Sequence, residues 1–212
     1  MRILYSLVLI LYCYQASAQR IAFQWANPDF EDEPHAGAIG VPIMKGWADC
    51  GHYGPKSTFA YSPPDVQPGF FGVEQKAHHG ATYISMVARA DGTCERMAQL
   101  LAKPLIADSC YKFSVWLSKS ADFASYVPSG DYVDFSKPLK LRMWGSHKLG
   151  QFDELLAETD IVNVAVWMPY LIQFKASAAY KFITFESTWA TTNEPYNGSL
   201  LIDDLSAVEF CY

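Results

Sequence analysis

Residues 198–210, GSLLIDDLSAVEF, are the most informative stretch of the sequence. They predict a terminal β-strand in which an apolar run leads into the adjacent carboxylates of Asp203 and Asp204. Burying two carboxylates in an apolar strand is costly unless a cation neutralises them. Carboxylates are also grouped near the other end of the chain, in residues 27–32, NPDFED. We therefore expect the last strand to lie beside the start of the domain, with carboxylates from both ends around a metal ion.

The first 18 residues have the pattern of a signal peptide. Arg2 precedes an apolar run over residues 3–14, and Ala16-Ser17-Ala18 fits a small-x-small cleavage site. The apolar run is too short to span a bilayer, and no later run is longer. We predict cleavage after Ala18 and one domain over residues 19–212, exported without membrane insertion to the periplasm, the cell surface or the extracellular space.

The composition limits the possible partners. The formal net charge of −6 argues against nucleic acid and anionic membrane surfaces. Half of the residues are hydrophobic and 15% are aromatic, which supplies a core and leaves aromatic side chains for a surface. A glycan partner is compatible with this composition, as is a protein at the cell surface.

Four cysteines remain once Cys13 leaves with the signal peptide. An even number in an exported domain predicts two disulfides, for which three connectivities exist. We favour Cys110–Cys211 with Cys50–Cys94. Cys110 opens one predicted strand and Cys211 follows another, so these two would meet if the strands pair antiparallel.

The chain reads mostly as strands and turns. The clearest strand is Cys110–Ser118, in which Tyr111, Phe113 and Val115 alternate with polar residues or Trp116. Residues 94–102 fit a strand or a helix, and residues 153–158 predict a helical turn. Many strands with Gly and Pro turns favour an all-β antiparallel sandwich. Other predicted strands cover residues 21–25, 82–88, 139–143, 170–175 and 183–188, and residues 52–80 predict an irregular loop.

Several stretches carry a family resemblance. Residues 27–31, 46–47, 99–101, 110–116 and 201–206 resemble the jelly-roll modules of the galactose-binding-like superfamily, and most closely carbohydrate-binding modules of the family 4/9/22 type. Residues 46–51, 63–69 and 139–145 also resemble an uncharacterised group of exported domains from Gram-negative, gliding-type bacteria. The resemblance implies a jelly-roll β-sandwich over nearly all of the mature chain.

The resemblance also implies a structural calcium ion. In such jelly rolls the ion joins an N-terminal Phe-Glu motif to a C-terminal Ile-Asp motif, and the matching residues here are Glu31 and Asp203. Calcium takes six to eight oxygen ligands, so backbone carbonyls would complete the shell. The alternative is that Glu31 and Asp203 are ordinary hydrogen-bonded carboxylates. His78 and His79 are expected as loop histidines without a metal.

A ligand-binding face follows from the strand alternation. If Tyr111, Phe113 and Leu141 face the core, a row of tryptophans and polar residues occupies an outer face. Such a face suits a saccharide, because a pyranose ring stacks on Trp while its hydroxyls bind polar side chains. The alternative is that these tryptophans pack beneath the insertion at residues 121–137. The predicted ligand-binding residues are Trp116, Lys140, Arg142, Trp144, Gln173 and Glu186.

Three functions are compatible with these observations. The first is a non-catalytic carbohydrate-binding domain, and the second is a structural or protein-interaction domain at the cell surface. The third is a small polysaccharide lyase or glycoside hydrolase. A hydrolase needs two carboxyls beside the bond, and Glu186 is the only acid placed on the expected face. Arg142, Gln173 and Tyr126 keep a lyase possible.

Overall fold

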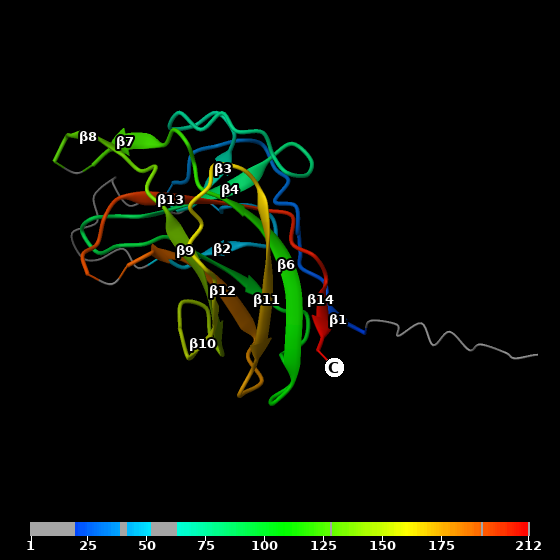
Figure 1. Cartoon of the computed structure of the whole chain (residues 1–212). Helices are drawn as coiled ribbons and strands as arrows, with labels where there is room; N and C mark the ends of the chain where they lie inside the picture. The colour runs from blue at the N-terminus through cyan, green and yellow to red at the C-terminus, as the bar shows by residue number, and fades with distance from the viewer. Residues whose placement is uncertain (1–19, 39–41, 52–62, 128, 192, 212) are drawn as a thin grey trace, which may run out of the picture.

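The structure is a computed structural model that describes residues 20–38, 42–51, 63–127, 129–191 and 193–211. Its described residues form β-strands, turns and loops without a helix (Figure 1). The predicted signal peptide at residues 1–18 lies outside this part of the chain. In the described residues there is no helix that could cross a membrane.

The larger sheet has seven strands. Its order is β1-β14-β6-β13-β4-β3, and β11 pairs with the other side of β6. All pairings are antiparallel. The bounds are β1 Ile21–Phe23, β3 Asp65–Gln67, β4 Tyr83–Ala88, β6 Cys110–Ser118, β11 Met168–Lys175, β13 Gly198–Asp203 and β14 Val208–Phe210.

The smaller sheet has five antiparallel strands in the order β10-β9-β12-β5-β2. A separate hairpin, β7–β8, projects from one end of the molecule (Figure 1). The bounds are β2 Ala48–Asp49, β5 Arg96–Leu100, β7 Ala124–Tyr126, β8 Tyr132–Asp134, β9 Leu139–Ser146, β10 Glu154–Glu158 and β12 Phe182–Trp189.

The two sheets pack face to face as an antiparallel jelly-roll β-sandwich, which confirms the predicted fold class. The core between them follows the predicted alternation: Tyr111, Phe113 and Val115 of β6 are buried, and the residues between them are half-buried. Trp25 and Trp47 stack at 6.0 Å between ring centroids, and Phe185 of the smaller sheet contacts both rings. Burial of these large side chains is the main stabilising term of the sandwich.

A second, smaller core covers the outer face of the larger sheet. Tyr83, Val87 and Leu201 of this sheet pack against Phe123 and Phe135, which flank the β7–β8 hairpin. The predicted insertion at residues 121–137 is therefore a cover over β4 and β13. Both of these strands are buried along their whole length as a result.

Three sequence-based expectations differ from the structure. The predicted terminal strand is two strands, because Asp204 has a positive φ of 48° and interrupts the ladder between β13 and β14. The predicted helical turn is β10, which pairs with β9. Part of the predicted irregular loop is the buried strand β3. Residues 94–102 contain β5, so the strand alternative holds there.

The cysteines follow only half of the prediction. Cys110 and Cys211 form a disulfide with a Cα–Cα distance of 5.2 Å, because β14 pairs with β6 directly beside them. Cys50 and Cys94 are free, half-buried thiols, so the predicted second bridge is wrong. Burial is the main cause that raises the pKa of each free thiol to about 12. Both thiols are therefore protonated and weakly nucleophilic at neutral pH.

Thiol titration tests this assignment. Unfolded protein that lacks residues 1–18 should react with a thiol reagent at two cysteines, and native protein should react slowly at both. Replacing Cys110 and Cys211 with Ser should lower the free energy of unfolding by about 2–5 kcal/mol. If the denatured protein has no reactive thiol, Cys50 and Cys94 are bridged. If it has four reactive thiols, the Cys110–Cys211 disulfide is absent.

Candidate functional site

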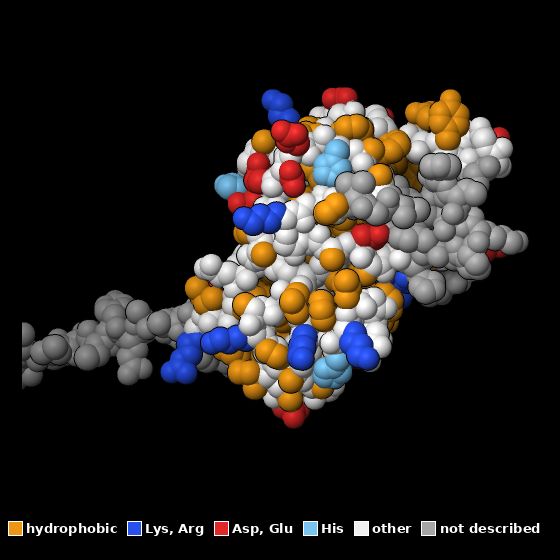
Figure 2. All heavy atoms as spheres, turned by 180° about the vertical axis from the view of Figure 1, so that it is seen from behind, with side chains coloured by type: hydrophobic (Ala, Val, Ile, Leu, Met, Phe, Trp, Pro, Cys, Tyr) orange, Lys and Arg blue, Asp and Glu red, His pale blue; other side chains and the backbone are white. Residues whose placement is uncertain are grey.

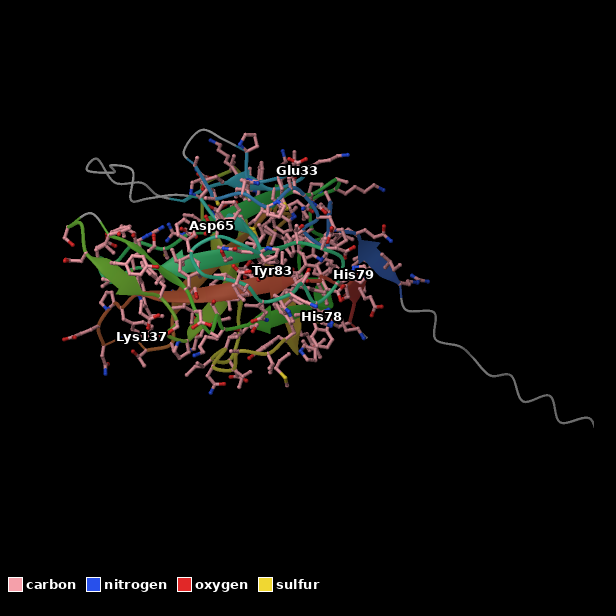
Figure 3. All side chains as sticks on the ribbon, turned by 90° about the horizontal axis from the view of Figure 1, so that it is seen from above. Glu33, Asp65, His78, His79, Tyr83 and Lys137 are labelled. Atoms are coloured by element: carbon pink, nitrogen blue, oxygen red, sulfur yellow. A yellow bond between two sulfur atoms is a disulfide. The ribbon has the colours of Figure 1, made fainter. Side chains whose placement is uncertain are left out.

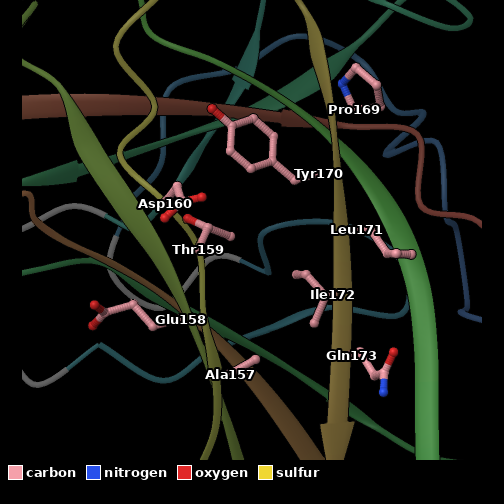
Figure 4. A pocket seen from close by; sticks show the side chains of 9 residues that line it. All are labelled: Ala157, Glu158, Thr159, Asp160, Pro169, Tyr170, Leu171, Ile172 and Gln173. Carbon is pink, nitrogen blue, oxygen red and sulfur yellow. The ribbon is translucent and has the colours of Figure 1, made fainter.

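A groove of about 440 Å³ lies between β10 and β11, the neighbouring edge strands of the two sheets (Figure 4). It exists because, among the described strands, β11 bonds only to β6 and β10 only to β9, so no ladder of these strands closes the sandwich here. Tyr170 and Ile172 point into the groove from β11, opposite Thr159 and Asp160, which follow β10 (Figure 4). The full lining is Ala157, Glu158, Thr159, Asp160, Pro169, Tyr170, Leu171, Ile172 and Gln173.

A cationic pair holds Glu158 at the rim of the groove. Lys140 Nζ lies 2.7 Å from Glu158 Oε1, and Arg142 Nε lies 2.6 Å from Oε2. Burial acts to raise the pKa of Glu158, but the hydrogen bonds from Lys140 and Arg142 outweigh it and lower that pKa. Glu158 is therefore an ionised acceptor at neutral pH, and it compensates the cations beside it.

Tyr170 supplies an aromatic wall with a hydroxyl donor. Its ring is half-buried, so one part packs on the sandwich and another part faces the groove. Burial, followed by the nearby charge of Asp160, raises the pKa of Tyr170. The phenol therefore keeps its proton at neutral pH and can donate it to a ligand oxygen. Asp160 is exposed beside this hydroxyl and can accept hydrogen bonds.

The six predicted ligand-binding residues do not share one face. β6 and β11, which carry Trp116 and Gln173, belong to the larger sheet, whereas β9 and β12 belong to the smaller one. The expectation of a single face therefore fails for Trp116 and Gln173, whereas Lys140, Arg142, Trp144 and Glu186 share the outer face of the smaller sheet. Of the six, Gln173 lines the groove, and Lys140 and Arg142 bind its rim residue Glu158. Trp116, Trp144 and Glu186 are not among its lining residues.

Trp116 is already covered by a protein side chain. The imidazole of His78 stacks on it with 3.7 Å between ring centroids and 16° between planes. His78 Nδ1 lies 3.0 Å from Asp204 Oδ2, at an angle outside hydrogen-bond geometry. His78 and His79 lie close together on one side of the molecule (Figure 3). A sugar ring could stack on Trp116 only after His78 moves away.

Trp144 and Glu186 belong to a polar network on the outer face of the smaller sheet. Trp144 Nε1 donates to Glu186 Oε2 at 2.6 Å, and Arg96 Nε donates to Oε1 at 2.8 Å. The Arg96 guanidinium also lies 4.6 Å from the centre of the Phe152 ring. Glu186 is 4% exposed and fully engaged by these donors. The network positions Trp144 and leaves Glu186 without a free oxygen for catalysis.

The two predicted calcium ligands bind the same loop through backbone amides. Glu31 Oε1 accepts hydrogen bonds from Ala81 N at 2.8 Å and Thr82 N at 3.2 Å. Asp203 Oδ2 accepts from the backbone N–H groups of His78 and His79, at 2.7 and 3.0 Å. Carboxylates from both ends of the domain thus meet at residues 78–82. We call this arrangement the amide clamp.

The amide clamp does not fit a calcium ion shared by Glu31 and Asp203. Calcium needs oxygen ligands, whereas both carboxylates face N–H donors of residues 78–82. Across the described ranges, no three His, Cys, Asp or Glu side chains are grouped to hold a metal ion. Gly80 also has a φ of +66° and lies against the Glu31 carboxylate, where a Cβ would collide. Calcium binding here stays a prediction.

Two buried carboxylates were not recognised from the sequence as a cluster. Asp65 accepts from Gly37 N and from the Ser85 hydroxyl, and Glu95 pairs with Arg89. Burial is the main cause that raises the pKa of both carboxyls far above the ordinary value. Perturbed carboxyls can indicate an active site. Asp65 and Glu95 are each 2% exposed, so no substrate reaches them and their role is structural.

Comparison with known proteins finds related folds only among solved structures. No family model matches the chain, and no curated protein matches it. The xylan-binding CBM22-1 domain of Xyn10C from Paenibacillus barcinonensis is 12% identical, with a TM-score of 0.45 over 83% of this chain and 92% of that one. A CBM4 structure is 16% identical, with a TM-score of 0.47 over 88% and 99% of the two chains.

An adhesin structure has a comparable similarity. The K1 cleaved adhesin domain of Lys-gingipain from Porphyromonas gingivalis W83 is 9% identical, with a TM-score of 0.45 over 85% of this chain and 98% of that one. The solved structures thus include the family 4 and family 22 module types that the sequence resembles. At these identities and TM-scores, the similarity says nothing about what this chain binds.

Removing a carboxylate of the amide clamp tests its role. Asp203→Ala leaves backbone N–H groups of a buried site without an acceptor, so the free energy of unfolding should fall by on the order of 3 kcal/mol. Asp204→Ala, at a half-buried neighbour, should cost less. Thermal melting should give the same Tm in calcium and in excess chelator. A lower Tm in chelator that Asp203→Ala abolishes would restore the calcium site.

The buried carboxyls predict a pH dependence of stability. Folded protein keeps protons on Asp65 and Glu95 at pH values where the unfolded chain has released them. Stability from these groups is therefore present at mildly acidic pH and is lost as the pH rises through the raised folded pKa values. The Tm should fall between pH 5 and pH 8, and Asp65→Asn should reduce that fall. If the Tm of Asp65→Asn falls with pH as much as the Tm of the exposed control Asp32→Asn, the assignment is contradicted.

Proposed function

We propose that this chain is an exported, non-catalytic carbohydrate-binding domain that holds a neutral saccharide in the β10–β11 groove. The observation that carries the proposal is the half-buried Tyr170 ring facing Asp160 across one open groove, with Glu158 and Gln173 at its rim (Figure 4). Saccharides need an aromatic surface for the C–H face of the ring and polar side chains for the hydroxyls. The groove supplies both.

The charges around the groove favour a neutral ligand. Lys140 and Arg142 are engaged by Glu158, so these cations are compensated before a ligand arrives. Asp160 then adds a further negative charge beside Tyr170. An anionic polysaccharide would meet this carboxylate without a free cation among the lining residues. A neutral pyranose chain meets only hydrogen-bonding groups.

Several features support export and binding without catalysis. A disulfide between Cys110 and Cys211 is expected in an oxidising compartment, in agreement with the signal-peptide pattern ending at Ala18. Glu158 is held ionised by two cations, so it is unsuited to serve as the protonated acid that glycoside hydrolysis needs. These features favour a binding role over the hydrolase alternative.

Affinity electrophoresis tests the proposal. Mature protein should be retarded by at least one neutral polysaccharide in a panel of xylan, mixed-linkage glucan, mannan and laminarin, and not by alginate. Tyr170→Ala removes the aromatic wall and should weaken binding about tenfold, which corresponds to about 1.4 kcal/mol. Tyr170→Phe keeps the ring and should lose less.

A matched control separates the groove from other exposed tyrosines. Tyr126 is 71% exposed in β7 and does not line the groove, so Tyr126→Ala should bind like the wild type. Retardation that is unchanged in Tyr170→Ala but lost in Tyr126→Ala would move the saccharide away from the groove. No retardation by any neutral polysaccharide in the panel would contradict the function.

A further inference from the structure

Two large aromatic side chains stand exposed at the tip of the β7–β8 hairpin. Tyr126 is 71% exposed and Tyr132 is 63% exposed, although the two are paired across the strands. Their ring centroids lie 5.0 Å apart with 61° between the ring planes. The space-filling view shows an apolar protrusion at the upper right, where the hairpin lies in this orientation (Figure 2). We call Tyr126 and Tyr132 the tyrosine pair.

The hairpin is held firmly at its base. Phe123 stacks on Phe71 with 5.4 Å between ring centroids, and it contacts Phe135 at 5.6 Å. Backbone hydrogen bonds join Ala124 N to Phe71 O at 3.0 Å and Phe135 N to Phe123 O at 2.7 Å. The tyrosine pair is therefore presented on a preorganised support, which reduces the entropy cost of binding a partner.

A second groove lies beside the tyrosine pair. It has a volume of about 410 Å³, and Tyr132 forms part of its wall together with Asp122 and Asp134. Phe71 and Gly72, from the loop after β3, also line this groove. The tyrosine pair thus borders a hollow surface with carboxylates, rather than standing alone in solvent.

The charged residues of the hairpin segment have one sign. Residues 121–136 contain Asp122, Asp131 and Asp134 and no Lys or Arg. The flanking Lys137 lies over the ring of Tyr196, 5.5 Å from its centroid, and so is directed to another residue. A guanidinium can stack on a tyrosine ring and bind a carboxylate with paired hydrogen bonds. Tyr132 lines one groove here with the carboxylates of Asp122 and Asp134, of which Asp134 also accepts hydrogen bonds from Ser136.

We propose that the β7–β8 hairpin is a docking surface for a basic, arginine-bearing segment of a partner protein. Tyrosine on a rigid support is typical of protein-binding surfaces, where it supplies contact area at low entropy cost. The three aspartates give the surface charge complementarity to that segment and would steer its approach. A neutral saccharide could also stack on Tyr132, but it would leave the charge of the hairpin without a role.

Fluorescence anisotropy with a defined probe tests the proposal. The probe is a labelled eight-residue peptide of alternating Arg and Gly, titrated with the mature protein at low and at physiological salt. Wild type should bind, with weaker affinity at higher salt. Tyr126→Ser with Tyr132→Ser should weaken binding at least tenfold while the Tm stays unchanged, because both side chains are exposed. Asp122→Asn with Asp131→Asn and Asp134→Asn should weaken it and reduce the salt dependence.

A matched control separates docking from general attraction to an acidic protein. Asp32→Asn with Glu33→Gln and Asp108→Asn removes three exposed charges away from the hairpin and should leave the affinity within twofold of wild type. Equal losses in this control and in the aspartate variant would overturn the proposal. Unchanged peptide binding in the variant that lacks both tyrosines would also overturn the proposal. If that variant loses binding to neutral polysaccharide and keeps its affinity for the peptide, the proposal is overturned as well.

Discussion

The amide clamp is the constraint on which the arrangement of the chain ends depends. Glu31, near the start of the described chain, and Asp203, at the end of β13, hold the backbone of the same five-residue loop. Asp203 is completely buried, and an unsatisfied carboxylate there would be costly. Three backbone N–H groups, including that of Asp204, donate to this carboxylate, although burial still raises the pKa of Asp203 to about 7. The loop in turn places His78 on Trp116.

The two sides of β6 in the larger sheet are extended unequally, and this leaves one side of the sandwich open. The larger sheet gains β1 and β14 beyond β6 at one side, and the Cys110–Cys211 disulfide fastens that region. On the other side of β6 the sheet stops at β11, which pairs with no further strand in the part of the chain that the structure describes. The β10–β11 groove is a direct result of this unequal closure. The proposed saccharide site and the sheet topology therefore have the same cause.

Local sequence patterns predicted strands well and their assembly less well. The alternation in Cys110–Ser118 identified β6, because that strand has one face on the core and one outside it. The same alternation cannot say which sheet a strand joins. Trp116 and Trp144 were therefore placed on one face, although β6 and β9 belong to different sheets. Long-range pairing decides this, and no local pattern records it.

Tyr170 and Glu158 of the groove were not predicted from the sequence, for comparable physical reasons. Tyr170 lies on the same face of β11 as the core residues Ile172 and Phe174, so the pattern indicated burial, but at the edge of a sandwich this position is only half covered. Glu158 was overlooked because residues 153–158 suggested a helical turn. Sequence spacing also could not show that the Cys94 thiol donates a hydrogen bond to Glu186 while Cys50 stays a separate free thiol.

Chemical-shift mapping tests the central claim, saccharide binding between the two sheets, most directly. An oligosaccharide of the tightest-binding neutral polysaccharide would be titrated into isotope-labelled mature protein while backbone amide and tyrosine ring signals are followed. The account predicts that the largest shifts cluster at Glu158, Asp160, Tyr170 and Gln173, with the signals of Tyr126 and Trp116 unmoved. Saturable shifts that centre on Trp116 or on the β7–β8 hairpin, with the groove unaffected, would contradict it.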